Sequence, residues 1–337
     1  MDSLTQIVLG AAVGEATLGK KVGNKAMLWG AIAGTIPDLD VMIGRFTDTV
    51  TELEVHRGFS HSILFALLFA PVFGWLIQQL YPKAGTTWKD WAKLMFWGLF
   101  THPLLDLFTT WGTQLFYPLP DRLALKTIFV IDPLYTLPFL TCLLFALRLR
   151  KNDPKRAFYG RLGLILSSSY LLITMFVKAY ANTIFTQALD AQQITYSRFD
   201  TRPTPLNILL WTSNIETEEA FLIGYYSFLD DSKDIRFKVV PKKHYLITSL
   251  MTQQEIRRLL SITEGYYTVE QKGENQFLVN DLRFGELAGW EPESSFVFTY
   301  VVDTKDNQVV QITQKRNTFD DAPKLMRTLW KRILGNR

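Results

Sequence analysis

Imidazole and carboxylate side chains, the usual nitrogen and oxygen ligands of divalent metals, gather at three places in the first third of the chain. The first is an Asp-x-Asp pair that follows a proline, and the second is a His-Arg-Gly-Phe-Ser-His segment. The third is a His-Pro-Leu-Leu-Asp segment, whose i,i+4 spacing puts the imidazole and the carboxylate on one face of a helix. The six donors are Asp38, Asp40, His56, His61, His102 and Asp106.

This donor set predicts a divalent metal site. A mixture of nitrogen and oxygen donors without a thiolate favours zinc, with manganese or iron as alternatives. Asp132, which precedes a proline, is a seventh candidate ligand. Because one zinc takes three or four protein ligands, we expect one or two ions, with some of these residues supporting the ligands. Without a cation, the carboxylates would repel one another in a medium of low dielectric.

Each donor also has a structural interpretation, which stays open at this point. The aspartates could cap helices or turns, and the pair in the third segment could form a structural hydrogen bond. In the second segment, His56 could be a solvated loop residue, and His61 could cap the helix that follows. All these residues are expected at the same ends of their helices, in one layer of the membrane, and this coincidence favours the metal site. The fourth histidine, His244, stands in a Lys-Lys-His run and is expected at the surface.

The elements that carry these donors are strongly apolar. A bilayer is crossed by about 20 apolar residues. Two weaker stretches precede the long runs, at residues 4–18 and 26–36, and each holds two glycines four residues apart that permit close helix packing in a membrane. We therefore predict a membrane all-α bundle of about six helices over residues 1–182. Its four long apolar runs are residues 62–81, 94–116, 127–147 and 162–177.

Basic residues mark alternate loops of this bundle. They concentrate at residues 20–25, 83–93 and 148–161, whereas the loop at residues 41–60 mixes both signs. By the positive-inside rule the three basic loops are cytoplasmic. The metal site, at the opposite ends of the helices, and the C-terminal domain are then predicted on the outer side.

Residues 190–337 are expected to form a soluble α+β domain. Two hairpins are predicted, from residues 266–270 with 276–279 and from 296–302 with 308–313, because strand-like runs flank short turn sequences. Short helices are expected at residues 252–261 and 321–334. The last helix is amphipathic, so its apolar stripe either packs on its own domain or lies on a membrane surface.

Composition excludes some classes of protein. The net charge of +4 is small for 337 residues, and no basic cluster on one face predicts nucleic-acid binding. Cys142 is the single cysteine, so an internal disulfide cannot form. No His-Glu-x-x-His sequence occurs, which disfavours an intramembrane zinc protease.

Several motifs in order resemble the YdjM/YbcI-like family of membrane-bound metal-dependent hydrolases, over about residues 1–180. These are Met-Asp-Ser-Leu-Thr-Gln at 1–6, Ile-Pro-Asp-Leu-Asp at 36–40, His-Arg-Gly-Phe-Ser-His-Ser at 56–62, His-Pro-Leu-Leu-Asp at 102–106 and Trp-Gly-Thr at 111–113. The resemblance implies a hydrolase of the bacterial inner membrane with a divalent metal. Gln6 stands where many members have histidine, which bears on one ligand or on the metal count.

We therefore expect a metal-dependent hydrolase that acts on an ester or phosphoester of a lipid or lipid-linked substrate. The catalytic set is the six donors of the three segments together with Arg57, whose guanidinium could pair with an anionic headgroup. Two alternatives remain. The same residues could form the ion pathway of a metal or proton transporter, or the helices could be a metal-stabilised membrane anchor for a binding domain.

Overall fold

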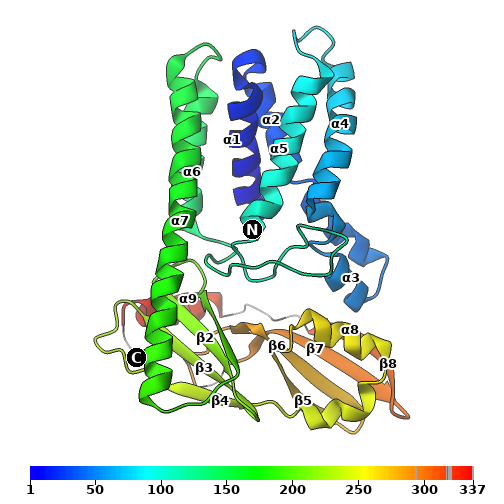
Figure 1. Cartoon of the computed structure of the whole chain (residues 1–337), viewed down its shortest axis with the longest axis vertical. Helices are drawn as coiled ribbons and strands as arrows, with labels where there is room; N and C mark the ends of the chain where they lie inside the picture. Colours follow the sequence, from blue (N-terminus) through cyan, green and yellow to red (C-terminus); the bar gives the residue numbers. More distant parts are fainter. Residues whose placement is uncertain (293, 316, 318–320, 336–337) are drawn as a thin grey trace. The chain divides into compact units, whose positions relative to one another are not determined.

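The chain folds into two compact units in the computed structural model, which describes residues 1–292, 294–315, 317 and 321–335 (Figure 1). The first unit comprises Met1–Arg45, Val55–Val177 and Pro205–Asn207. The second comprises Phe46–Glu54, Lys178–Thr204 and Ile208–Arg337.

Helices make up the first unit. The long apolar run at 62–81 forms one of them as predicted, while the run at 94–116 contributes only its first part. The helices are α1 (Ser3–Val22), α2 (Asn24–Ala33), α4 (Ile63–Leu80), α5 (Trp88–Asp106), α6 (Pro133–Arg148) and α7 (Pro154–Ala191), with the 3₁₀ helices η1 (Pro37–Arg45) and η2 (Phe59–His61).

The predicted C-terminal ends of α5 and α7 were wrong, for different physical reasons, and α6 and α7 also begin at Pro133 and Pro154 instead of at residues 127 and 162. Helix α5 ends at Asp106. The Thr109 hydroxyl donates a hydrogen bond to the Asp106 carbonyl oxygen, and Gly112 adopts a φ of +83°. Helix α7 instead runs far past Lys178, because a charge ends an apolar run without ending a helix. Its final turns belong to the second unit.

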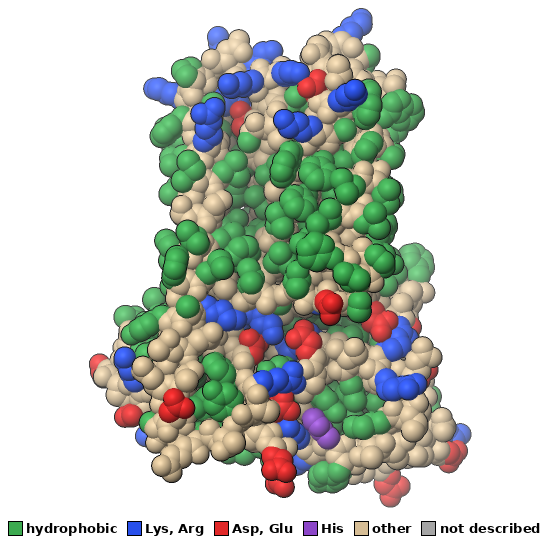
Figure 2. Space-filling model, in the orientation of Figure 1, with side chains coloured by type: hydrophobic (Ala, Val, Ile, Leu, Met, Phe, Trp, Pro, Cys, Tyr) green, Lys and Arg blue, Asp and Glu red, His purple; other side chains and the backbone are tan. Residues whose placement is uncertain are grey.

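The helical region has the apolar character of a membrane protein. Helices α4 and α7 are long and apolar enough to cross a bilayer, and the pair of α2 and η1, bent by 43°, is a third candidate span. Large apolar side chains are exposed along α4 and α7, such as Leu67, Trp75 and Phe176, and Figure 2 shows a broad apolar band on the visible face of this unit. Exposed patches of this extent are unusual in soluble monomers. The count of six membrane helices stays a prediction.

Helices α1 and α2 cross with their backbones in close contact, as their glycine pairs predict. A Cβ atom built on Gly10 would lie 2.2 Å from the carbonyl oxygen of Gly30. One built on Gly14 would lie 2.1 Å from the carbonyl oxygen of Ala26, and one on Gly34 would lie 2.5 Å from that of Gln6. The crossing therefore admits only hydrogen at these positions.

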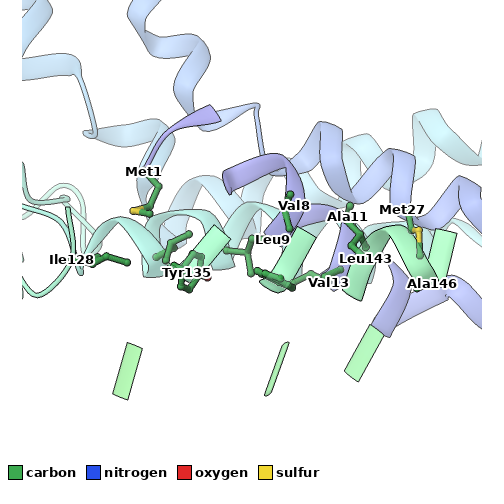
Figure 3. Packing of buried hydrophobic residues seen from close by; sticks show 13 residues of the cluster. Met1, Val8, Leu9, Ala11, Val13, Met27, Ile128, Tyr135, Leu143 and Ala146 are labelled. Atoms are coloured by element: carbon green, nitrogen blue, oxygen red, sulfur yellow. The ribbon is translucent and has the colours of Figure 1, made fainter. Parts of the chain in front are cut away.

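One core cluster joins α1 to α6 in this unit. Figure 3 shows Val8, Leu9 and Val13 of α1 beside Tyr135 and Leu143 of α6. Farther along α1, the Glu15 carboxylate accepts two hydrogen bonds from the buried Arg156 of α7, at 2.8 and 2.6 Å. These contacts set the position of α1, which carries Gln6 toward the candidate site.

The second unit contains two four-stranded antiparallel sheets, which confirms an α+β domain. Both predicted hairpins are present, as β5 with β6 and β7 with β8. The first sheet was not predicted strand by strand, because β2 buries threonine, serine and asparagine side chains and lacks polar-apolar alternation. The strands are β1 (Arg198–Pro203), β2 (Leu210–Glu216), β3 (Ala220–Ser227), β4 (Phe237–Pro241), β5 (Tyr267–Gly273), β6 (Gln276–Glu286), β7 (Phe296–Lys305) and β8 (Gln308–Lys315).

Short helices accompany these sheets. The two predicted ones are present within one or two residues of their expected bounds. They are α8 (Gln254–Ile262) and α9 (Ala322–Ile333), and the unit also holds η3 (His244–Leu250) and most of α3 (Thr49–Val55).

The glycine crossing yields a stability prediction. Gly10→Ala should destabilise the protein by about 1–3 kcal/mol, because its methyl group meets a backbone carbonyl that cannot rotate away. Thermal unfolding of the full-length protein in detergent measures this effect. Gly273→Ala is the control, since a Cβ there has no atom within 4 Å. Equal unfolding temperatures for the two variants would contradict the packing argument.

Candidate metal centre

Four predicted ligands from three segments converge at one end of the helical unit. Asp38 lies in the first turn of η1, His61 ends η2, and His102 and Asp106 share one face in the last turns of α5. One donor atom from each lies within 4.8 Å of all the others. The i,i+4 pair delivers two donors, and the turns before α4 and after α2 deliver the other two.

The distances between these donors match a metal-binding geometry. The Nε2 atoms of His61 and His102 are 3.1 Å apart, and they lie 3.3 and 3.4 Å from Asp38 Oδ1. Asp106 Oδ2 lies 3.5 and 3.4 Å from the same two nitrogens. Tetrahedral coordination with bonds near 2.0–2.1 Å requires donor separations of about 3.3–3.5 Å. Five of the six donor separations therefore lie close to those of tetrahedral coordination, and all four donors lie within 4.8 Å of one another.

Burial leaves one ligand oxygen without a hydrogen bond. Asp106 is fully buried, and among the described residues its Oδ2 has no hydrogen-bond partner. An unpaired buried carboxylate oxygen costs several kcal/mol of free energy unless a charge compensates it. This orphaned atom points at the two imidazole nitrogens, which is the arrangement expected around a metal ion.

Both histidines are held by their second ring nitrogen. His102 Nδ1 lies 2.6 Å from the carbonyl oxygen of Gly34, so its N–H donates there and Nε2 carries the lone pair. His61 Nδ1 lies 3.3 Å from Asp40 Oδ2 and 3.0 Å from Ser60 Oγ. Such contacts fix the tautomer and the ring orientation of metal-binding histidines.

Asp40 organises the second segment and lies outside the four-donor group. Its buried carboxylate accepts hydrogen bonds from the Arg57 backbone N–H at 2.9 Å and from Ser60 Oγ at 3.0 Å. Its other oxygen lies 3.1 Å from His56 Nδ1. Asp40 thus connects a partly exposed imidazole, that of His56, to the buried ligand His61. The geometry favours a supporting role for Asp40 and His56.

Arg57 is buried within the centre. Its Nε lies 3.4 Å from Asp106 Oδ2, and its Nη1 donates a 2.7 Å hydrogen bond to Thr109 Oγ1. The residue has a φ of +59°, an uncommon backbone conformation that turns the side chain inward. The guanidinium therefore adds positive charge directly beside the ligand carboxylate.

Gln6 also supports Asp106. Its Nε2 donates to Asp106 Oδ1 at 3.1 Å and to the carbonyl oxygen of His102 at 3.3 Å. The amino group of Met1 contacts the same Oδ1 atom. The Gln6 side-chain amide thus hydrogen-bonds to the carboxylate of Asp106, one of the four donors. Gln6 itself is outside the four-donor group.

Asp132 has a structural environment. Its Oδ1 accepts hydrogen bonds from the backbone N–H groups of Leu134 and Tyr135, and its Oδ2 accepts one from the Tyr170 hydroxyl. It therefore caps the start of α6, and it does not belong to the four-donor group. The geometry favours the capping interpretation of this residue over the ligand interpretation.

His244 is half-buried in the second unit, where a surface position was expected. Its ring stacks on Tyr267 with centroids 3.9 Å apart, and Nε2 lies 2.8 Å from the Tyr267 carbonyl oxygen. Burial lowers the pKa of His244. His244 is not a member of the four-donor group.

Protons and metal compete for His61. Burial by itself lowers the pKa of His61, whereas hydrogen bonds to three neighbouring carboxylates raise it, and the net pKa is about 9. Without a metal the ring is therefore protonated at neutral pH. Metal binding must displace this proton, so affinity for the metal should rise with pH up to about 9.

Three supporting groups were missed from the sequence. Ser60 and Thr109 are common hydroxyl residues inside a motif or just after one, and the sequence carried no signal of their contacts. The Gly34 carbonyl is a backbone group, although the glycine pair on α2 marked the place where α2 approaches α1. Only the structure of the crossing between α1 and α2 shows where this carbonyl group lies.

The geometry separates two predicted aspartates experimentally. Asp40→Asn should weaken metal affinity about 10–100-fold, because it disturbs the orientation of His61. Asp132→Asn should leave metal affinity unchanged, although loss of the α6 cap should cost about 1 kcal/mol of stability. Titration of the metal-free, full-length variants with Zn²⁺ measures both affinities. Equal weakening by the two substitutions would refute this assignment.

Comparison with known proteins places the helical unit. Residues 1–184 match the family described as YdjM inner membrane protein. The chain is 31% identical over 144 residues to the uncharacterized protein YfhP of Bacillus subtilis (strain 168), which covers 40% of this chain and 42% of YfhP. It is 35% identical over 96 residues to the inner membrane protein YbcI of Escherichia coli (strain K12), covering 28% and 54% respectively.

These matches fix the family without fixing an activity. The chain spans about half the length of the curated relatives that it matches. No solved structure matches it. Because the family match extends over more than half of the chain and includes all four converging donors, the protein belongs to the YdjM family of inner membrane proteins.

Proposed function

We propose that this protein is a membrane-bound metal-dependent hydrolase that acts on an ester or phosphoester of a lipid or lipid-linked substrate. The observation that carries the proposal is the convergence of two imidazoles and two carboxylates, whose donor atoms lie within 4.8 Å of one another. Four donors from three segments favour a single ion over two, with zinc as the metal and manganese or iron as alternatives.

Unequal exposure of the ligands supports catalysis over a purely structural role. The Asp38 side chain is 26% exposed, whereas those of His61, His102 and Asp106 are fully buried. Catalytic metal sites keep one position open to water and substrate, while structural sites are closed. Substrate would therefore approach on the Asp38 side.

The surrounding residues suit hydrolysis. When bound, a divalent metal supplies Lewis-acid activation of the ester and of the attacking water. Arg57, buried beside Asp106, would stabilise negative charge that develops on the ester or phosphoryl oxygens. His56 is 25% exposed and contacts Asp40, so its imidazole could exchange protons between the centre and solvent.

Apolar side chains around Asp38 favour a lipid substrate. The same 3₁₀ helix, η1, exposes Leu39, Val41 and Met42, and Phe59 is exposed two residues before the ligand His61. Acyl chains could pack on these side chains while the polar ester reaches the centre. Membrane lipid is thus the proposed environment and the proposed source of substrate.

We further propose that six helices, α1, α2, α4, α5, α6 and α7, form the membrane bundle. The three basic loops gather at the end opposite to the metal centre, where Lys21 binds Asp90 at 2.7 Å and Lys151 Nζ lies 3.4 Å from the Lys21 carbonyl oxygen. Figure 2 shows basic side chains clustered at that end. By the positive-inside rule this end is cytoplasmic, and the centre and the second unit lie on the outer side.

Cysteine labelling tests this orientation. In a Cys142→Ala background, Ser232→Cys in the second unit should react with an impermeant maleimide in intact cells. Asn152→Cys, in the basic loop before α7, should react only after permeabilisation, because it lies on the cytoplasmic side. The opposite pattern would reverse the orientation and move the centre to the cytoplasmic side.

Substitution of the ligands tests the activity. His102→Ala and Asp106→Asn should abolish both metal binding and hydrolysis of ester and phosphodiester lipids in mixed micelles, because each removes a donor. Arg57→Gln should keep the metal but lower the rate about 10²–10³-fold, as for other groups that stabilise developing charge. His244→Ala, in the second unit, is the control and should retain activity.

Two outcomes would overturn the assignment. Full turnover by His102→Ala protein would exclude the centre from catalysis. Zinc uptake into proteoliposomes by wild-type protein that hydrolyses none of the lipids would favour the transporter instead.

A further inference from the structure

Helix α9 is anchored to the second unit along one row of side chains. Leu329 and Ile333 are buried in a cluster with Leu210. Arg332 is buried as well and donates to both carboxylate oxygens of Asp230, at 2.6 and 2.8 Å. Ser227 Oγ donates to the carbonyl oxygen of Ile333. The helix is therefore a fixed part of the domain, and its remaining faces are available for another interaction.

A second row on α9 is apolar and exposed. Met326, Trp330 and Leu334 are 37%, 51% and 61% exposed, and their spacing of four residues aligns them along the helix. Leu229 is also exposed, and its carbonyl oxygen lies against Gly335 just after the helix. Only part of the apolar stripe predicted from the sequence packs on the domain.

A third row is basic. Lys324, Arg327 and Lys331 are exposed. At 3.6 residues per turn they lie next to the apolar row, on the side away from the buried one. A helix that presents an apolar row with tryptophan beside a row of cations has the features of helices that lie in a membrane interface. Tryptophan is enriched at that interface because its ring is apolar and its N–H is polar.

We propose that the outer face of α9, formed by Met326, Trp330, Leu334 and the three cations, binds the surface of an anionic phospholipid membrane. The charges are complementary to acidic headgroups, and the apolar row suits the shallow acyl region below them. The chain also supplies proximity. Helix α7 is a candidate membrane span of 38 residues, about 57 Å long, and its final turns belong to the second unit. This tether raises the effective concentration of the bilayer surface.

This contact would restrict the motion of the second unit relative to the bilayer. It depends on the membrane location of the protein and is independent of hydrolysis. Near an acidic membrane surface each lysine or arginine contributes about a fivefold factor to binding. Removing two cations from α9 should therefore shift the ratio of bound to unbound domain by roughly 25-fold.

Spin labelling of the full-length protein tests the contact. A nitroxide is attached at Met326→Cys in a Cys142→Ala background, and the protein is placed in phosphatidylcholine nanodiscs with or without phosphatidylglycerol. With the anionic lipid present, accessibility to oxygen should rise and accessibility to a water-soluble nickel complex should fall. A label at Gln311→Cys, exposed on β8, should show no such change.

Charge variants supply the matched control. Arg327→Gln with Lys331→Gln should return the Met326→Cys label to aqueous accessibility, whereas Lys272→Gln, an exposed cation on β5, should not. Equal aqueous accessibility at positions 326 and 311 in anionic nanodiscs would overturn the proposal. Spin–spin broadening that persists in every lipid would also overturn it, because it would identify a second copy of the chain as the partner.

Discussion

The buried carboxylate of Asp106 is the constraint on which the candidate centre depends. It lies at the end of α5 with no exposure to solvent, and its Oδ2 lacks a hydrogen-bond partner among the described residues. One imidazole from the same helix, and one imidazole and one guanidinium from the segment before α4, point at this oxygen. A buried charge is tolerated only when other groups compensate it. His102 on α5, together with Arg57 and His61 in the segment before α4, supplies this compensation.

The rest of the helical unit serves to bring those turns to α5. The glycine crossing of α1 and α2 places the Gly34 carbonyl where it accepts the N–H of His102. The same crossing carries Gln6 to Asp106. The Asp40 carboxylate then holds the segment from His56 to His61, because it accepts hydrogen bonds from the backbone N–H of Arg57 and the hydroxyl of Ser60. Small residues far from the donors thus contribute to the geometry, because the helix backbones must approach closely before the side chains can meet.

The sequence predicted the donors better than their division of labour. The i,i+4 spacing identified the His102 and Asp106 pair, and the long apolar run identified α4. The glycine pairs predicted the close crossing of α1 and α2. The sequence could not separate Asp38, a member of the four-donor group, from Asp40, a supporting residue two positions later, because both carboxylates share one motif. Asp132 was named for its residue type, and only the structure showed its contacts with α6 and α7. Strand β2 was missed because it buries threonine, serine and asparagine side chains, which weakens the periodic signal.

X-ray absorption spectroscopy of purified, full-length protein after loading with one equivalent of Zn²⁺ tests the central claim most directly. The account predicts a first shell of four to five nitrogen and oxygen atoms at about 2.0–2.2 Å, with multiple-scattering features from two imidazoles. Those features should be lost together with the metal in the His61→Ala variant. A first shell of water oxygens alone, a sulfur ligand, or an imidazole signal that survives substitution of His61 would contradict the four-donor centre.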